Sequence, residues 1–282
     1  MRTKTYCLFF ALFFISSSLF GQTIIKDKSY VSGTWKKSGS PYIIEGEAIV
    51  AIGKTLKIKP GVVIQFKTGD VRDYTSMSFS SGFLRVNGTL TAKGKAKKMI
   101  LFRRKGSRGS WGCIQINDKT NKSVLSYCKV MHSHYIKNIV EDDNATGAIS
   151  VYKSSPEIKN CVLVKNFWAA INCKENSAPL IKNSTIVGNR YGIECNSKSD
   201  PKIENTIVWR NKAAFYINNK SNPTITHSLV DEDLSEHDLI DDGTNIVDEN
   251  PLFISVKADN YELRKNSPCR GKASNGRNIG AF

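Results

Sequence analysis

A repeat of about 22 residues constrains this chain more than any other feature of its sequence. The segment SAPLIKNSTIVGN (Ser177–Asn189) returns as SDPKIENTIVWRN (Ser199–Asn211), 22 positions later. The repeated positions form columns of like residues: Pro156, Pro179, Pro201 and Pro223; Ile158, Ile181, Ile203 and Ile225; Asn160, Asn183 and Asn205, broken at His227; and Asn166, Asn189 and Asn211. A fixed period of this length indicates a repeat architecture.

Each repeat contains short runs of alternating apolar and polar residues, bounded by Asn, Gly, Pro and Ser, which is typical of strands. A second strand in each repeat carries the apolar column Ile149, Ile171, Ile193 and Phe215. No useful length of the chain has a helical period, and 22 residues are too few for a helix pair or a propeller blade. One such unit suits one coil of a parallel β-helix, in which coils stack about 4.8 Å apart and bury their inward side chains together.

Three groups of segments resemble a known family. They are GTWKKSGSPYIIEGEAIVAIGKTLKIKPGVVIQF (Gly33–Phe66); NGTLTAKG, ILF and WGCIQI; and ENPLFISVKADNYELRKNSPCRG with NIGAF. They are similar to the first coils, the next coils and the ending of secreted bacterial right-handed parallel β-helix proteins of the pectin-lyase-like superfamily. The resemblance implies an all-β, right-handed parallel β-helix. It implies no particular chemistry, because this fold carries lyases, hydrolases, epimerases and non-catalytic binders.

Residues 1–21 predict a secretory signal peptide. Arg2 and Lys4 precede an apolar run, Cys7–Ile15, that is too short to cross a membrane, and small residues follow up to Gly21. We therefore expect a secreted, periplasmic or cell-surface protein without a transmembrane segment. Residues 22–282 predict one β-helix domain: an N-terminal cap and first coils over 22–110, regular coils over 111–230, and an acidic segment with a C-terminal cap over 231–282. The expected caps are the GTW coil and the NIGAF segment, because open sheet edges promote aggregation.

The formal net charge of +16 favours anionic partners. Outside a cell these are acidic polysaccharides or envelope glycans, and no zinc-finger or RNA-binding motif predicts a nucleic-acid partner. The segment Lys93–Arg108 holds a predicted buried strand, MILF, between two basic turns. A basic surface that only confers solubility is the alternative, and we expect a monomer.

The candidate ligand-binding residues lie on and beside one strand face. Gln115, Ser150, Asn172, Glu194 and Tyr216 alternate with apolar columns and predict an exposed file across the coils. Trp168 and Tyr191 fall at matching bends, and Lys153, Lys198 and Lys220 each precede a proline by three positions. The predicted ligand-binding set is Lys153, Trp168, Tyr191, Glu194, Lys198, Tyr216 and Lys220. Aromatic rings beside cations suit an acidic sugar chain, although an ordinary solvated face has the same composition.

No catalytic residue is predicted. A glycosidase needs two carboxyl groups about 5 to 9 Å apart, and the acidic residues of the regular coils stand at unrelated offsets: Glu157, Glu175, Glu194, Asp200 and Glu204. Acidic side chains at 141–143 and 231–249 offer oxygen ligands of the kind that Ca²⁺ prefers, but without the spacing of an EF-hand. We expect no cofactor and no metal, with calcium as the alternative.

Six cysteines remain after the signal peptide, and Cys128 with Cys161, and Cys173 with Cys195, share inward columns. Stacked neighbours have parallel Cβ directions, which suit buried free thiols better than disulfides.

The sequence favours a non-catalytic protein that binds acidic polysaccharide or forms a surface scaffold. One alternative is a polysaccharide lyase, or related carbohydrate-active enzyme, acting on uronate-containing glycans with the inserted loop Lys137–Gly147 as one wall of its groove. Another is a purely structural envelope component.

Overall fold

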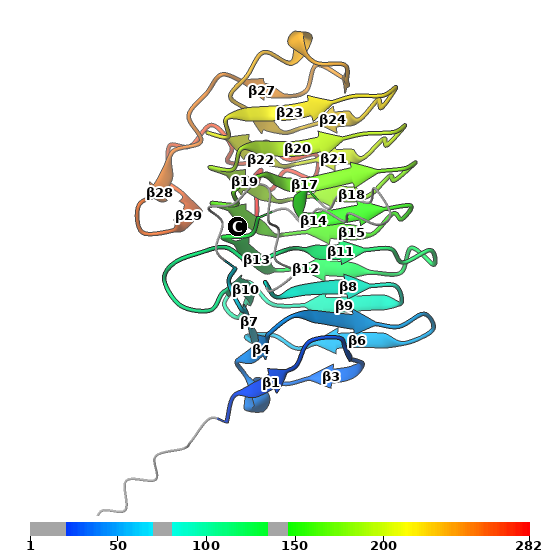
Figure 1. Ribbon diagram of the computed structural model, residues 1–282. Helices are drawn as coiled ribbons and strands as arrows, with labels where there is room; N and C mark the ends of the chain where they lie inside the picture. Colours follow the sequence, from blue (N-terminus) through cyan, green and yellow to red (C-terminus); the bar gives the residue numbers. More distant parts are fainter. Residues whose placement is uncertain (1–20, 70–80, 135–145) are drawn as a thin grey trace, which may run out of the picture.

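The computed structural model describes residues 21–69, 81–134 and 146–282, and within them the chain winds through three long parallel sheets (Figure 1). Sheet A has ten strands: β1 (Thr23–Ile25), β4 (Tyr42–Ile44), β7 (Val63–Phe66), β10 (Ile100–Arg104), β13 (Cys128–Met131), β16 (Val162–Val164), β19 (Thr185–Val187), β22 (Ile207–Trp209), β25 (Leu229–Val230) and β27 (Ile246–Val247). Sheet B has eight: β2 (Ser29–Tyr30), β5 (Glu47–Val50), β8 (Phe83–Val86), β11 (Ile114–Ile116), β14 (Gly147–Tyr152), β17 (Ala169–Lys174), β20 (Tyr191–Cys195) and β23 (Ala213–Ile217). Sheet C has nine: β3 (Gly33–Trp35), β6 (Thr55–Ile58), β9 (Thr89–Lys93), β12 (Val124–Ser126), β15 (Glu157–Lys159), β18 (Leu180–Lys182), β21 (Lys202–Glu204), β24 (Thr224–Thr226) and β26 (Ile240–Asp241).

The chain visits sheets A, B and C in turn, so each round is one coil and each strand pairs with its equivalent in the next coil. The register aligns like with like: Ile149 pairs with Ile171, then Ile193 and Phe215 follow in the same column. The isoleucines of the proline-marked strands align in the same way along sheet C. These columns are buried and form one continuous core. The predicted parallel β-helix is confirmed.

A ladder of asparagine side chains supports the bend between sheets A and B. Asn189 Nδ2 donates to Leu163 O (3.1 Å) and to Asn211 Oδ1 (2.9 Å), while Asn189 Oδ1 accepts from both the backbone N–H and the Nδ2 of Asn166. Asn166 Oδ1 in turn accepts from Ser133. Each amide thereby satisfies backbone groups that the bend leaves outside the sheets, which is why the sequence repeats Asn at this position.

The other asparagine column marks the turn from sheet C to sheet A. Asn160, Asn183 and Asn205 have φ values of 52°, 46° and 50°, and His227 continues the column at 47°. Asparagine tolerates this left-handed conformation better than most residues. The backbone conformation of this turn therefore explains why asparagine repeats in the column.

The C-terminal residues lie against the flank of the stack, where β28 (Phe253–Ser255) and the antiparallel β29 (Asn260–Leu263) pack beside sheet A (Figure 1). We expected NIGAF to cap the end of the helix, and that expectation was wrong. Gly280 N donates to Asn205 O (2.9 Å) and Ala281 N donates to Thr185 Oγ1 (3.0 Å). The outer face of sheet A carries apolar side chains, and the C-terminal segment buries them in a second cluster.

The end of the stack is covered instead by the segment that follows β25. Its short 3₁₀ turn, η2 (Leu234–Glu236), places Leu234 in the main core, and His237 lies edge-on to Phe215. At the opposite end, Trp35 stacks on Tyr42 beside a second 3₁₀ turn, η1 (Lys37–Gly39).

The six cysteines among the described residues are buried free thiols. Cys173 pairs in register with Cys195, and burial together with the neighbouring thiol raises the pKa of Cys195 well above its ordinary value. These side chains act as small apolar groups in the core. The predicted signal peptide up to residue 20, and the part of the predicted inserted loop up to residue 145, lie outside the described residues.

Candidate functional site

Three predicted aromatic residues come together on sheet B: Trp168 just before β17, Tyr191 at the start of β20 and Tyr216 near the end of β23. The Trp168 and Tyr191 rings meet edge to face with centroids 5.7 Å apart, and the Tyr191 and Tyr216 rings lie 5.0 Å apart at 31°. They belong to three successive coils but to different register positions, since Tyr191 pairs with Ala169 and Ala213, and Tyr216 pairs with Glu194. Tyr216 is 43% exposed. We call these three residues the aromatic platform.

Arg190 completes the platform and was missed by sequence reasoning. Its guanidinium carbon lies 4.2 Å from the centroid of the Trp168 ring and 5.6 Å from that of Tyr191. Within the described part of the chain no carboxylate pairs with Arg190, and its buried Nε has no hydrogen-bond partner. Among the described residues, the cation is therefore held by stacking on the Trp168 and Tyr191 rings. The available signal was its position immediately before Tyr191.

The predicted polar file exists, but its predicted exposure was wrong. Gln115, Ser150, Asn172, Glu194 and Tyr216 stand in register across five strands. The first four are between 0% and 6% exposed, and only Tyr216 is open to solvent. Alternation predicted that these side chains point away from the core; it carries no information on what packs over them.

Glu194 is the buried acid of this file. It accepts hydrogen bonds from Thr146 Oγ1 (2.8 Å) and Asn196 Nδ2 (2.9 Å). Burial raises the pKa of its carboxyl, while the bonds from Thr146, Asn196 and Trp168 oppose that change. The Glu194 side chain thus links Trp168 to strand β20, and both of its oxygens accept hydrogen bonds from neighbouring side chains.

The three predicted lysines lie at the opposite edge of sheet B. Lys153, Lys198 and Lys220 are exposed and occupy left-handed turn positions after the strands, with φ of 48°, 58° and 62°. The five residues of β20 separate the two edges by about 16 Å, at roughly 3.3 Å per residue. The structure therefore separates Trp168 and Tyr191 from the lysines, with Tyr216 near the far end of β23, and Arg190 is the cation that stacks on the aromatic rings.

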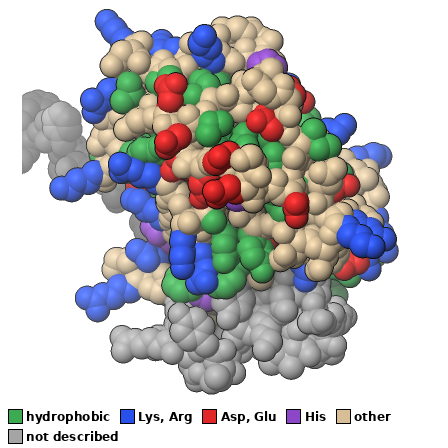
Figure 2. Space-filling model, turned by 90° about the horizontal axis from the view of Figure 1, so that it is seen from above, with side chains coloured by type: hydrophobic (Ala, Val, Ile, Leu, Met, Phe, Trp, Pro, Cys, Tyr) green, Lys and Arg blue, Asp and Glu red, His purple; other side chains and the backbone are tan. Residues whose placement is uncertain are grey.

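The acidic segment after β25 covers the end of the stack, where Figure 2 shows Asp and Glu side chains gathered with Lys and Arg around the rim. Its first acids accept backbone hydrogen bonds that a further coil would otherwise satisfy: Asp231 from Arg210 N (2.6 Å) and Glu232 from Ala214 N (2.8 Å). Among the described residues no group of three or more His, Cys, Asp or Glu side chains is placed to hold a metal ion. The acids at 141–143 lie outside the described range.

The basic segment Lys93–Arg108 contains β10, with Ile100 and Phe102 buried as the sequence indicated. Its lysines at 95, 97 and 98 are exposed at the turn from sheet C to sheet A. Further positive charge of the segment, at Arg103, Arg104, Lys105 and Arg108, lies at the end of β10 and in the connection from sheet A to sheet B.

Comparison with family models matches residues 105–252, slightly more than half of the chain, to the family described as the right-handed β-helix region. The chain belongs to the right-handed β-helix family. The match covers the regular coils of this β-helix protein, including the whole aromatic platform. No curated protein matches the chain. Across the described residues, no helix of the β-helix protein has the length and apolar character needed to span a membrane.

Proposed function

We propose that this β-helix protein is an exported, non-catalytic binder of acidic polysaccharide, related to the secreted bacterial pectin-lyase-like proteins that its sequence resembles. The observation that carries the proposal is the aromatic platform with Arg190 stacked on it. Ring centroids 5.0 and 5.7 Å apart on successive coils form an extended surface that suits a chain of sugar rings.

Each part of the platform supplies one element of recognition. Tyrosine and tryptophan offer broad faces with a polar end, which suits contact with the apolar faces of sugars. A guanidinium pairs with a carboxylate through two parallel hydrogen bonds, and this geometry favours uronate or sulfate units over neutral ones. The net charge of +16 adds a long-range attraction for polyanions.

The single acid of the polar file supports binding over catalysis. Glycoside hydrolysis by the usual route requires two carboxyl groups on either side of the bond. Glu194 is the only acid of the described polar file, and both of its oxygens accept hydrogen bonds from neighbouring side chains. In this function Glu194 orients the Trp168 ring.

Affinity electrophoresis through gels containing polygalacturonate tests the proposal. We expect retardation of the wild-type protein by polygalacturonate and little by a neutral galactan. Tyr216→Ala should weaken retention several-fold because it removes the exposed ring of the platform. Tyr30→Ala is the matched control, since Tyr30 is 76% exposed and lies on the first coil, away from the platform.

Equal mobility in acidic and neutral gels would contradict the proposal. Formation of unsaturated uronate, followed by ultraviolet absorbance with and without Ca²⁺, would replace the binder with a polysaccharide lyase, the alternative that the fold family also accommodates.

A further inference from the structure

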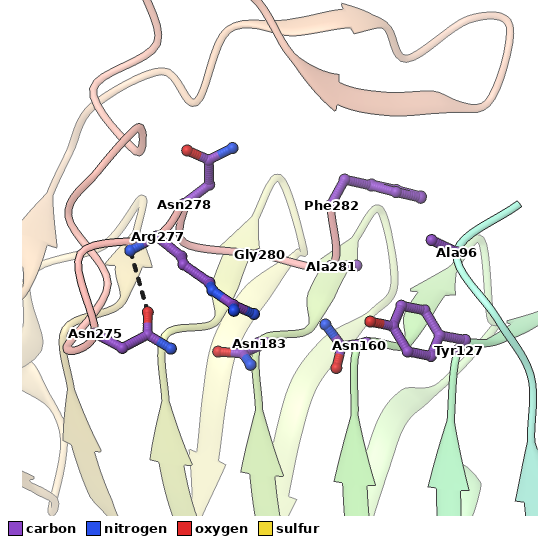
Figure 3. Close-up of a pocket in the computed structure, with 10 residues that line it drawn as sticks. All are labelled: Ala96, Tyr127, Asn160, Asn183, Asn275, Arg277, Asn278, Gly280, Ala281 and Phe282. Carbon is purple, nitrogen blue, oxygen red and sulfur yellow. Dashed lines mark hydrogen bonds between the residues drawn. The ribbon is translucent and has the colours of Figure 1, made fainter.

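A separate hollow of about 350 Å³ lies at the turn from sheet C to sheet A, beneath the C-terminal segment (Figure 3). Its floor is formed by turn residues of three successive coils, Tyr127, Asn160 and Asn183, and its roof by the segment from Asn275 to Phe282. The volume is at the lower end of the range for small-molecule sites, roughly 300 to 1,000 Å³.

The amides on the floor are held in place but have no partner. Asn160 and Asn183 occupy left-handed turn positions that fix their backbones, and no described residue bonds to either side chain. Asn205, the next member of the column, shows what such an amide does when a partner is present. It donates to Ser274 Oγ (3.0 Å) and accepts from Ser274 N (2.8 Å).

Arg277 has the only charged side chain among the ten residues that line the hollow. Its backbone is fixed, because Ala273 N donates to Arg277 O (2.9 Å) and Arg277 N donates to Asn275 Oδ1 (3.1 Å). In Figure 3 its guanidinium points toward the amides of Asn183 and Asn160, and the Tyr127 hydroxyl points toward Asn160. The exposed lysines at 95 and 97 flank Ala96 at the rim and add positive charge.

We propose that this hollow binds one carboxylated sugar unit. Arg277 pairs with the carboxylate, the amides of Asn160 and Asn183 and the phenol of Tyr127 bond to ring hydroxyls, and Phe282 covers an apolar face of the sugar. The unit is either a free sugar acid or the end of an acidic glycan, because both present the same chemistry. The inference stands apart from the aromatic platform, since none of the lining residues belongs to it.

Isothermal titration with galacturonate, and with galactose as its neutral counterpart, tests the site. We expect galacturonate to bind at least about tenfold more tightly than galactose, because a charge-assisted hydrogen bond contributes more than a neutral one. Arg277→Gln should remove that preference. Lys272→Gln is the control, since it removes an exposed cation of the same segment that does not line the hollow.

Asn183→Gly separates binding from folding, because glycine keeps the left-handed turn and loses only the amide. We expect an unchanged unfolding midpoint and weaker binding of galacturonate. Tyr216→Ala should leave galacturonate binding unchanged, so failure of the aromatic platform and failure of this site remain distinguishable.

Oligogalacturonate and free galacturonate identify the source of the sugar unit. Binding of both, each weakened by Arg277→Gln, supports a site that accepts the free acid and the chain end. Binding of the oligomer alone, if weakened by the same variant, supports a chain-end site. The proposal is overturned if galactose binds as tightly as galacturonate, if neither galacturonate nor oligogalacturonate binds, or if Arg277→Gln has no effect on binding.

Discussion

The same repeat builds the outer faces of sheets A and B, but the C-terminal segment covers the first face, while the second keeps an exposed tyrosine. On sheet A the outward side chains of β16, β19 and β22 are largely apolar, and the C-terminal segment covers them with Phe253, Tyr261 and Leu263. On sheet B the outward file is polar and ends in Tyr216, which stays exposed beside Tyr191. An apolar outer column thus indicates a surface that the chain covers itself. The polar file of sheet B is buried except at Tyr216, and under the proposed function it is the exposed aromatic side chain there that is left for a partner.

The largest expected effect comes from breaking the cover on sheet A. Phe253 meets Trp209 and Tyr261 edge to face, at 5.7 and 5.4 Å between centroids. Phe253→Ala should lower the free energy of unfolding by about 3 to 5 kcal/mol, as for other buried phenylalanines. Urea denaturation measures this change. Ile254→Ala, at the exposed neighbouring position, should change it by less than about 1 kcal/mol.

A loss of stability as large as this for Tyr216→Ala would contradict the contrast between the two faces. Tyr216 is exposed, and its removal is expected to alter binding and leave unfolding almost unchanged.

The next effect concerns the cation of the platform. Arg190→Gln should weaken polygalacturonate binding by about tenfold, because the charged bonds to the glycan are lost while the side-chain length is nearly kept. Arg210→Gln is a closely matched control: Arg210 lies 4.3 Å from the centroid of the Trp209 ring, in the same manner, but Trp209 belongs to the covered outer face of sheet A. Equal losses for both variants would show that overall charge, and no particular surface, drives binding.

The smallest effect is the pH dependence that Glu194 contributes. Burial raises the pKa of its carboxyl in the folded protein, so the folded state holds the proton more tightly than the unfolded state. Stability from this group is therefore present at acidic pH and falls as pH rises from the ordinary carboxyl value through the raised one. Glu194→Gln should flatten this decline, as measured by unfolding midpoints between about pH 4 and 8. A steeper decline in the variant would contradict the assignment.

The periodic part of the molecule could be predicted from sequence, and the non-periodic part could not. The repeat of 22 to 23 residues places Ile171 on Ile193 and Asn166 on Asn189, because stacked coils repeat every contact. The C-terminal segment has no repeat, so its position beside Thr185 and Asn205 was not evident. For the same reason, nothing in the sequence indicated the hollow at Asn160 and Asn183.

The candidate site was half predictable for a related reason. The repeat correctly placed Trp168, Tyr191 and Tyr216 on sheet B in three successive coils, although the strand register offsets them: Tyr191 pairs with Ala169 and Ala213, and Tyr216 pairs with Glu194. Lys198 was included with Tyr191 because the two residues are close in sequence. The extended strand β20 lies between them and holds them apart. The repeat passed over Arg190 because three different residues occupy that column: Trp168, Arg190 and Lys212.

Hydrogen exchange with and without polygalacturonate tests the central claim most directly, namely that the platform edge of sheet B is the binding surface and the outer face of sheet A is occupied by the chain itself. The account predicts that the glycan slows exchange in peptides covering Trp168–Ala170, Arg190–Glu194 and Ala213–Ile217, and leaves β28 and β29 unchanged. Slower exchange confined to Phe253–Leu263, or no change anywhere at saturating glycan, would contradict it.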